Sequence, residues 1–201
     1  MTDLYRAVKR LPETDLAGKG FQHDKLKEGF FRSVDEDRSV LFIVNGMWSH
    51  VELFSGVRFT GINRLLHTAA QRAGWAKERA AMFRLELVGM FLEKVGDFCA
   101  AKEDLGIYCP SDSIISSRAG LGSRVLEETA RLSELTTIEA SSSYVRERAL
   151  FEPLGLYMLP AAAKLSNDDE LWDWSVKHFA AEMTTEDRLQ YVAFICELDK
   201  Q

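Results

Sequence analysis

The stretch that decides the fold is residues 39–59, SVLFIVNGMWSHVELFSGVRF. Residues 40–44 are five consecutive apolar side chains, and they are followed by Asn45-Gly46, the pair that most easily adopts the positive φ angles of a two-residue hairpin turn. Residues 47–54 then alternate between two faces, as a strand does, and Ser55-Gly56 is expected to form a second turn before a third, short apolar strand. The pattern predicts a small antiparallel β meander over about residues 39–59.

From Thr60 onward, apolar residues recur at the spacing of helices. Thr60 is a suitable N-cap for a helix that ends at Gly74. A long helix is predicted next, over about residues 76–104, because its apolar side chains cover roughly half of the circumference when residues are placed at about 100° steps. A helix this apolar is expected to be central and packed on two sides.

Other helices are expected around this one. Asp24 is expected to begin a short helix that ends near the acidic residues 35–37, and residues 105–122 are expected to be largely a connection. The remaining predicted helices cover about residues 123–135, 137–151 and 167–183, and from Thr184 or Thr185 to Leu198. The predicted class is mainly α, an α-rich α+β fold, with an irregular helical bundle around the long central helix.

Length and composition indicate one globular domain. The chain has 201 residues, of which 46% are hydrophobic and 28% charged, enough to bury a real core. Alternatively, residues 1–59 form a β-containing subdomain packed on a helical region, residues 60–201. No apolar run is long enough to span a bilayer, so no membrane association is expected.

A cytoplasmic location is predicted from the amino-terminal residues and the cysteines. The first ten residues have no apolar core of a secretory signal. The three cysteines, Cys99, Cys109 and Cys196, form no CxxC pair and are odd in number, which favours reduced thiols.

The net charge of −6 is unevenly distributed. Residues 58–84 carry a local balance of +5, and residues 160–201 a balance of −5. Such a polarity can steer charged partners. The competing interpretation is that these charges only coat solvent-facing helix surfaces.

Common catalytic and cofactor motifs are missing. The sequence contains no GxxxxGK[ST] loop, no GxSxG elbow, no HExxH and no paired CxxC. We therefore expect no cofactor and no catalytic residue, and favour a non-enzymatic protein.

A metal site is one alternative. Glu86, Glu93 and Asp97 form a carboxylate row on the predicted long helix, and Glu170 and Asp173 from another helix could join it. Carboxylates from neighbouring helices can hold Mg²⁺ or Mn²⁺. The row predicts a metal-dependent hydrolase of a phosphorylated small molecule, but its position opposite the apolar sector equally suits a solvent face.

Two weaker motifs are also present. His50 and Glu52 share one face of the predicted strand and could act as a base and its orienting group. Residues 120–124, GLGSR, could begin a helix whose amides bind phosphate. A polar strand face and ordinary glycine punctuation are the competing interpretations.

The basic segment offers a nucleic-acid alternative. Arg58, Arg64, Arg72 and Lys77 are clustered in a chain that is otherwise acidic. Clustered cations are what a nucleic-acid surface needs.

The favoured site lies on the helix predicted over residues 167–183. Trp174 falls off its inward stripe, one turn from His178 and close to Lys177, and a large aromatic on a polar face often anchors a partner. We predict a cytosolic interaction protein (an adaptor, inhibitor or assembly subunit) that binds another protein there, with a homo-oligomer as the alternative. The competing interpretation is that the last helix, with Tyr191 and Phe194, covers Trp174.

Overall fold

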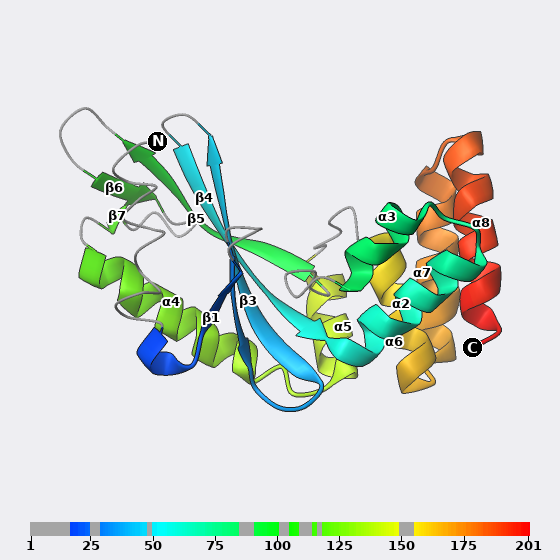
Figure 1. Cartoon of the computed structure of the whole chain (residues 1–201), viewed down its shortest axis with the longest axis horizontal. Coiled ribbons are helices and arrows are strands. Elements are labelled where there is room, and N and C mark those ends of the chain that lie inside the picture. Colours follow the sequence, from blue (N-terminus) through cyan, green and yellow to red (C-terminus); the bar gives the residue numbers. More distant parts are fainter. Residues whose placement is uncertain are drawn as a thin grey trace. The chain divides into compact units, whose positions relative to one another are not determined.

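The computed structural model describes residues 17–24, 29–47, 50–84, 91–100, 105–108, 114–115, 118–148 and 155–201. The chain divides into two compact units: Met1–Val57 with Leu92–Glu134, here the sheet unit, and Arg58–Phe91 with Leu135–Gln201, here the helical unit. The expected α-rich α+β class is confirmed, because helices account for more of the described residues than strands do (Figure 1). The prediction of one domain stays a prediction.

The described strands form one sheet in which each strand lies beside its neighbours in sequence. The pairs β1–β2, β2–β3, β5–β6 and β6–β7 are antiparallel. The strands are β1 (Gln22–Asp24), β2 (Gly29–Ser33), β3 (Arg38–Met47), β4 (His50–Phe59), β5 (Phe91–Ala100), β6 (Leu105–Tyr108) and β7 (Ile114–Ile115).

The predicted meander over residues 39–59 is therefore only part of a larger sheet. β3 and β4 overlap the predicted first and second strands, but the hairpin turn expected at Asn45-Gly46 is wrong, because both residues lie within β3, which continues to Met47. The second turn, expected at Ser55-Gly56, is wrong, because β4 continues to Phe59. Ser55, Gly56 and Val57 are buried within β4, and small residues fit a strand interior where other side chains cover it.

The long central helix predicted over residues 76–104 is wrong. Its first part is a short helix, α3 (Lys77–Ala81), followed by a 3-10 turn, η3 (Met82–Arg84), and its second part is β5. An apolar run fits a buried helix and a buried strand equally, and Gly96 lowers helix propensity. β6 supplies the antiparallel backbone partner, with Cys99 opposite Gly106.

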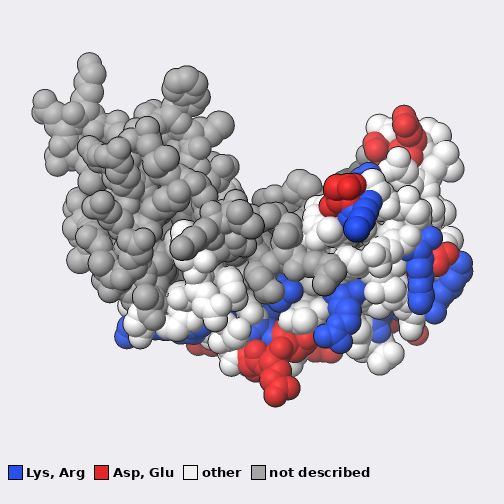
Figure 2. All heavy atoms as spheres, in the orientation of Figure 1, with Lys and Arg blue, Asp and Glu red and all other residues white. Residues whose placement is uncertain are grey.

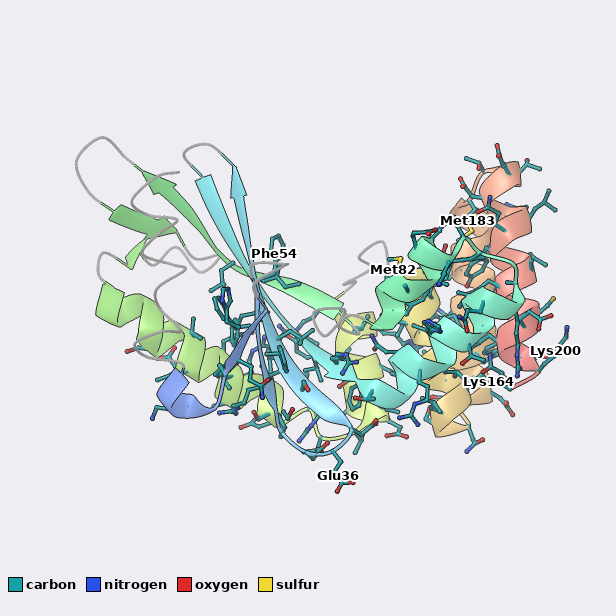
Figure 3. The ribbon with its side chains drawn as sticks, in the orientation of Figure 1. Glu36, Phe54, Met82, Lys164, Met183 and Lys200 are labelled. Atoms are coloured by element: carbon teal, nitrogen blue, oxygen red, sulfur yellow. The ribbon has the colours of Figure 1, made fainter. Side chains whose placement is uncertain are left out.

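The helix expected from Asp24 is also wrong, since β1 and β2 form a hairpin that continues into β3. Phe30 lies opposite Phe42 in the β2–β3 register. Asp35 forms the turn: its Oδ1 accepts from the backbone N–H of Asp37 (3.1 Å) and of Arg38 (2.8 Å). Carboxylates that bond their own backbone favour turns over helix interiors. Glu36 points away from this turn (Figure 3).

Helix α4 (Arg118–Ser133) belongs to the sheet unit and packs on β3. The sequence predicted that residues 105–122 would be largely a connection. The described residues in this range instead form β6, β7 and the first residues of α4. The two arginines Arg32 and Arg38 donate to the last residue of α4, to Ser133 Oγ and Ser133 O, at 3.3 Å each. Cations at a helix C-terminus satisfy its carbonyls and complement its dipole.

The helical unit contains α2 (Thr60–Arg72), α3, η3 and four further helices, in which α6 packs on α2, α5 and α7, and α2 packs on α8. Side-chain caps begin three of them: Thr137, Asp168 and Thr184 each accept from a backbone N–H three residues on. Thr60 is the first residue of α2 rather than its side-chain cap. The further helices are α5 (Ile138–Glu147), α6 (Gly155–Ser166), α7 (Asp169–Glu182) and α8 (Thr185–Asp199).

An aromatic cluster forms much of the core of the helical unit. Trp75 lies 5.2 Å from Tyr157, 5.3 Å from Phe194 and 6.0 Å from Phe83 between ring centroids. Tyr191 joins it through Tyr157 at 6.0 Å. Elsewhere in this unit, Lys164 Nζ lies 2.6 Å from Asp199 Oδ1, near the end of the chain where Lys200 is labelled (Figure 3).

Candidate functional site

The first candidate site lies on one face of α2. Its side chains come from Thr60 and from the residues four, seven and eight positions later, which are Arg64, His67 and Thr68. At these spacings the helix turns all four to the same side. Together with Arg58, Asn63 and Phe83 they line a pocket of about 340 Å³, here the α2 pocket. The whole of this lining belongs to the helical unit.

Two hydrogen bonds shape the α2 pocket. Arg58, only 7% exposed, donates from Nη1 to Thr60 Oγ1 at 3.2 Å. Buried Asn63 donates from Nδ2 to the carbonyl oxygen of Phe83 at 2.9 Å, which fastens η3 to α2. The Phe83 ring is fully buried in the aromatic cluster. The wall is therefore rigidly supported by the core.

The α2 pocket is suited to an anion. Arg58 and Arg64 bring two permanent positive charges to it, and His67 lies one turn beyond Arg64. None of the described residues that line it is acidic. Guanidinium groups bind planar or tetrahedral oxyanions by paired hydrogen bonds, so the chemistry available here is recognition of a phosphate or carboxylate group.

The four residues predicted for nucleic acid are only partly brought together. Arg58 and Arg64 line the α2 pocket, whereas Arg72, at the end of α2, and Lys77, at the start of α3, do not. A nucleic-acid strand needs several accessible cations along its backbone, and Arg58 is buried. On the face drawn in Figure 2, acidic and basic side chains are interspersed over the described surface.

The second candidate site surrounds Trp174 on α7. The indole is partly exposed, stacks on His178 with 4.8 Å between centroids and 11° between planes, and lies 4.9 Å from the Arg146 guanidinium of α5. Trp174, Arg146, Ser143 and Glu147 line a second pocket of about 460 Å³, here the α5–α7 pocket.

Of the residues predicted with Trp174, His178 packs against the indole, while Lys177 is exposed and pairs with Asp173 at 2.8 Å. Tyr191 and Phe194, which were expected as the alternative cover of Trp174, take part in the aromatic cluster around Trp75. The structure therefore leaves part of the Trp174 side chain open to solvent.

The predicted carboxylate row is not carried by a helix. Glu93 and Asp97 lie in β5, and Glu86 lies outside the described residues. Asp173 is paired with Lys177 and Glu170 is exposed on α7. Over the described parts of the chain, no group of three His, Cys, Asp or Glu residues is placed to hold a metal ion.

The two weaker motifs have different outcomes. His50 and Glu52 lie in β4, as expected of a strand pair. The glycine-rich residues 120–124 do not begin a helix, because α4 already begins at Arg118 and contains them. The alternative of a phosphate site at a helix start there is therefore wrong, and so is the competing interpretation of these glycines as punctuation between two helices.

Two exposed apolar residues of α8 do not belong to any site predicted from the sequence. Leu189 is 70% exposed and Val192 is 48% exposed, and they are three residues apart on the helix. The sequence contains a signal for this exposure. Apolar residues of α8 lie on the face that holds Tyr191 and Phe194 and also outside that face.

Among the described residues, no helix is both long and apolar enough to cross a lipid bilayer. The chain matches no protein-family model, no curated protein and no solved structure.

Proposed function

We propose that this protein acts by binding another protein in the cytoplasm, as an adaptor, inhibitor or assembly subunit, with Trp174 as its anchor. The observation that carries the proposal is the α5–α7 pocket, where a partly exposed indole and the Arg146 guanidinium stand side by side. Trp and Arg are the residues most enriched among those that dominate binding energy at protein interfaces.

The contacts of Trp174 support an anchoring role. Its stack on His178 and its cation–π contact with Arg146 restrict the indole before any partner arrives. A restricted side chain loses less conformational entropy on binding than a freely rotating one. An apolar side chain of the partner would cover the exposed part of the indole, while Arg146, Glu147 and Lys177 supply a polar rim.

The test is recovery of the partner from the protein's own cells, followed by native mass spectrometry and affinity measurement with the purified partner. Trp174→Ser should weaken binding at least about tenfold, the size expected of an anchoring aromatic. Leu189→Ser is the matched control, since it removes an apolar side chain that is 70% exposed on α8. It should leave the affinity within about twofold.

Two results would reject the proposal. One is unchanged affinity in Trp174→Ser, and the other is loss of the partner in Leu189→Ser alone, which would move the interface to α8. A complex whose mass is a multiple of the 22.8 kDa chain would identify the partner as a second copy.

The nucleic-acid alternative has weaker support, because only Arg58 and Arg64 of its four residues share a pocket. It requires affinity that falls steeply with added salt, and salt-independent binding would reject it. No observation on the described residues favours the metal-dependent hydrolase.

A further inference from the structure

We propose that the α2 pocket binds the phosphoryl group of a small phosphorylated molecule between Arg58 and Arg64. This site is separate from the Trp174 anchor, and the two pockets share no lining residue. The inference does not depend on the proposed protein partner.

The first step is the strength of the positive field. Arg58 is 7% exposed, so it acts in a medium less polarisable than water, where the attraction between opposite charges is stronger. Arg64 is exposed on α2, one helical turn after Thr60, and adds a second guanidinium at the pocket rim. Two fixed positive charges favour a doubly charged phosphate monoester over a singly charged carboxylate.

The second step is the supply of hydrogen-bond donors. Thr60 Oγ1 accepts from Arg58, which leaves the Thr60 hydroxyl proton to donate to a ligand oxygen. Thr68, by contrast, uses its hydroxyl to donate to the Arg64 carbonyl at 3.0 Å. The donors directed to a bound phosphate would therefore be the Arg64 guanidinium and the Thr60 hydroxyl, while Arg58 contributes its positive charge and orients Thr60.

The third step is size. A volume of about 340 Å³ lies near the lower end of small-molecule sites, which begin at roughly 300 Å³. It accommodates a phosphate with a small organic group. The buried Arg58 suits a ligand group that enters the pocket better than a polymer that runs along the surface.

The experiment is a calorimetric titration of the full chain with phenyl phosphate, and with benzoate as the carboxylate of similar size. We expect saturable binding of phenyl phosphate and at least about tenfold weaker binding of benzoate. Arg64→Gln should weaken phenyl phosphate binding at least about tenfold. The matched control is Arg72→Gln, the same change at another exposed arginine of α2 that does not line the pocket, which should stay within about twofold.

Thr60→Val tests the hydroxyl donor and should weaken phenyl phosphate binding about three- to tenfold. Circular dichroism and thermal unfolding establish that each variant is folded before it is titrated. No saturable binding of phenyl phosphate, or equal losses in Arg64→Gln and Arg72→Gln, would overturn the proposal. So would preferential binding of benzoate.

A single-stranded oligonucleotide forms the last arm. Binding of it that is tighter than that of phenyl phosphate, and that Arg64→Gln and Arg72→Gln weaken equally, would assign the surface to nucleic acid and reject the pocket. Trp174→Ser should leave phenyl phosphate binding unchanged, so this inference and the proposed protein interface fail independently.

Discussion

Tyr191 of α8 supplies a hydrogen bond that Pro160 removes from α6. In an uninterrupted helix the Leu156 carbonyl would accept from the N–H of residue 160, which as proline has none. The hydroxyl of Tyr191, a residue 1% exposed, donates to that carbonyl at 3.3 Å instead. The bond from α8 therefore satisfies a backbone group that α6 leaves open.

Tyr191→Phe should lower the free energy of unfolding by about 1 kcal/mol, because the Leu156 carbonyl loses its donor. In a Pro160→Ala background the same change should cost less, since alanine restores the backbone N–H at this position. A double-mutant cycle by urea unfolding measures the difference. Equal costs in both backgrounds would show that Tyr191 does not compensate for the proline.

Alkaline stability depends on the same residue. Burial, and secondly the nearby Tyr157, raise the pKa of Tyr191 well above its ordinary value of 10.0, and burial also raises the pKa of Tyr157. The folded state thus holds these protons when the unfolded chain has released them, so stability is complete below about pH 10 and falls as the pH rises further. Thermal unfolding between about pH 9 and 12 should show this decline, and it should be shallower in Tyr191→Phe. A decline of the same slope in the variant would contradict the assignment.

At the scale of the element, α4 is fastened to the sheet through a buried carboxylate. Glu128 is 4% exposed; its Oε1 accepts from Ser55 Oγ of β4 at 2.8 Å, and its Oε2 accepts from Arg131 Nε at 3.0 Å. Arg131 Nη2 also donates to Oε1. A helix whose carboxylate has bonding partners on both sides is held in one register on the strands.

Glu128→Gln should destabilise the protein by about 1–3 kcal/mol, because the charge-assisted bonds to Arg131 and the bond from Ser55 are weakened. Glu127→Gln, at the exposed neighbouring position, makes the same chemical change and should stay within about 0.5 kcal/mol. Urea unfolding monitored by circular dichroism compares the two. Equal effects would mean that the buried network contributes nothing specific.

At the scale of the whole molecule, the helical unit contains both candidate sites on different helices. The α2 pocket is built from β4, α2 and η3, and the α5–α7 pocket from α5 and α7. Because the two linings share no residue, Arg64→Gln should leave the affinity for the protein partner unchanged. A loss of partner binding in that variant, measured beside Arg72→Gln, would show that the sites are coupled.

The sequence by itself determined the elements that depend on local physics. Apolar periodicity located α2, α5, α7 and α8, with capping residues at the starts of the last three, and the apolar pattern over residues 40–54 located the strands β3 and β4. The turn expected at Asn45-Gly46 was not among these, because both residues lie within β3. Helical spacing also placed Trp174 off the inward stripe of its helix.

Only the tertiary structure decided features whose stabilising partners lie far away in the chain. Residues 91–100 are a strand because β5 lies between β4 and β6 in the sheet, with β6 paired to Asp97–Ala100. The spacing of apolar residues within the segment does not reveal these partners. Pro160 is accepted inside α6 because Tyr191 donates to Leu156 from another helix. Phe83 completes the α2 pocket through Asn63, and Arg146 completes the site of Trp174 from α5. Local patterns record the preferences of a segment, whereas the free energy of a buried segment depends on the partners that the fold brings to it.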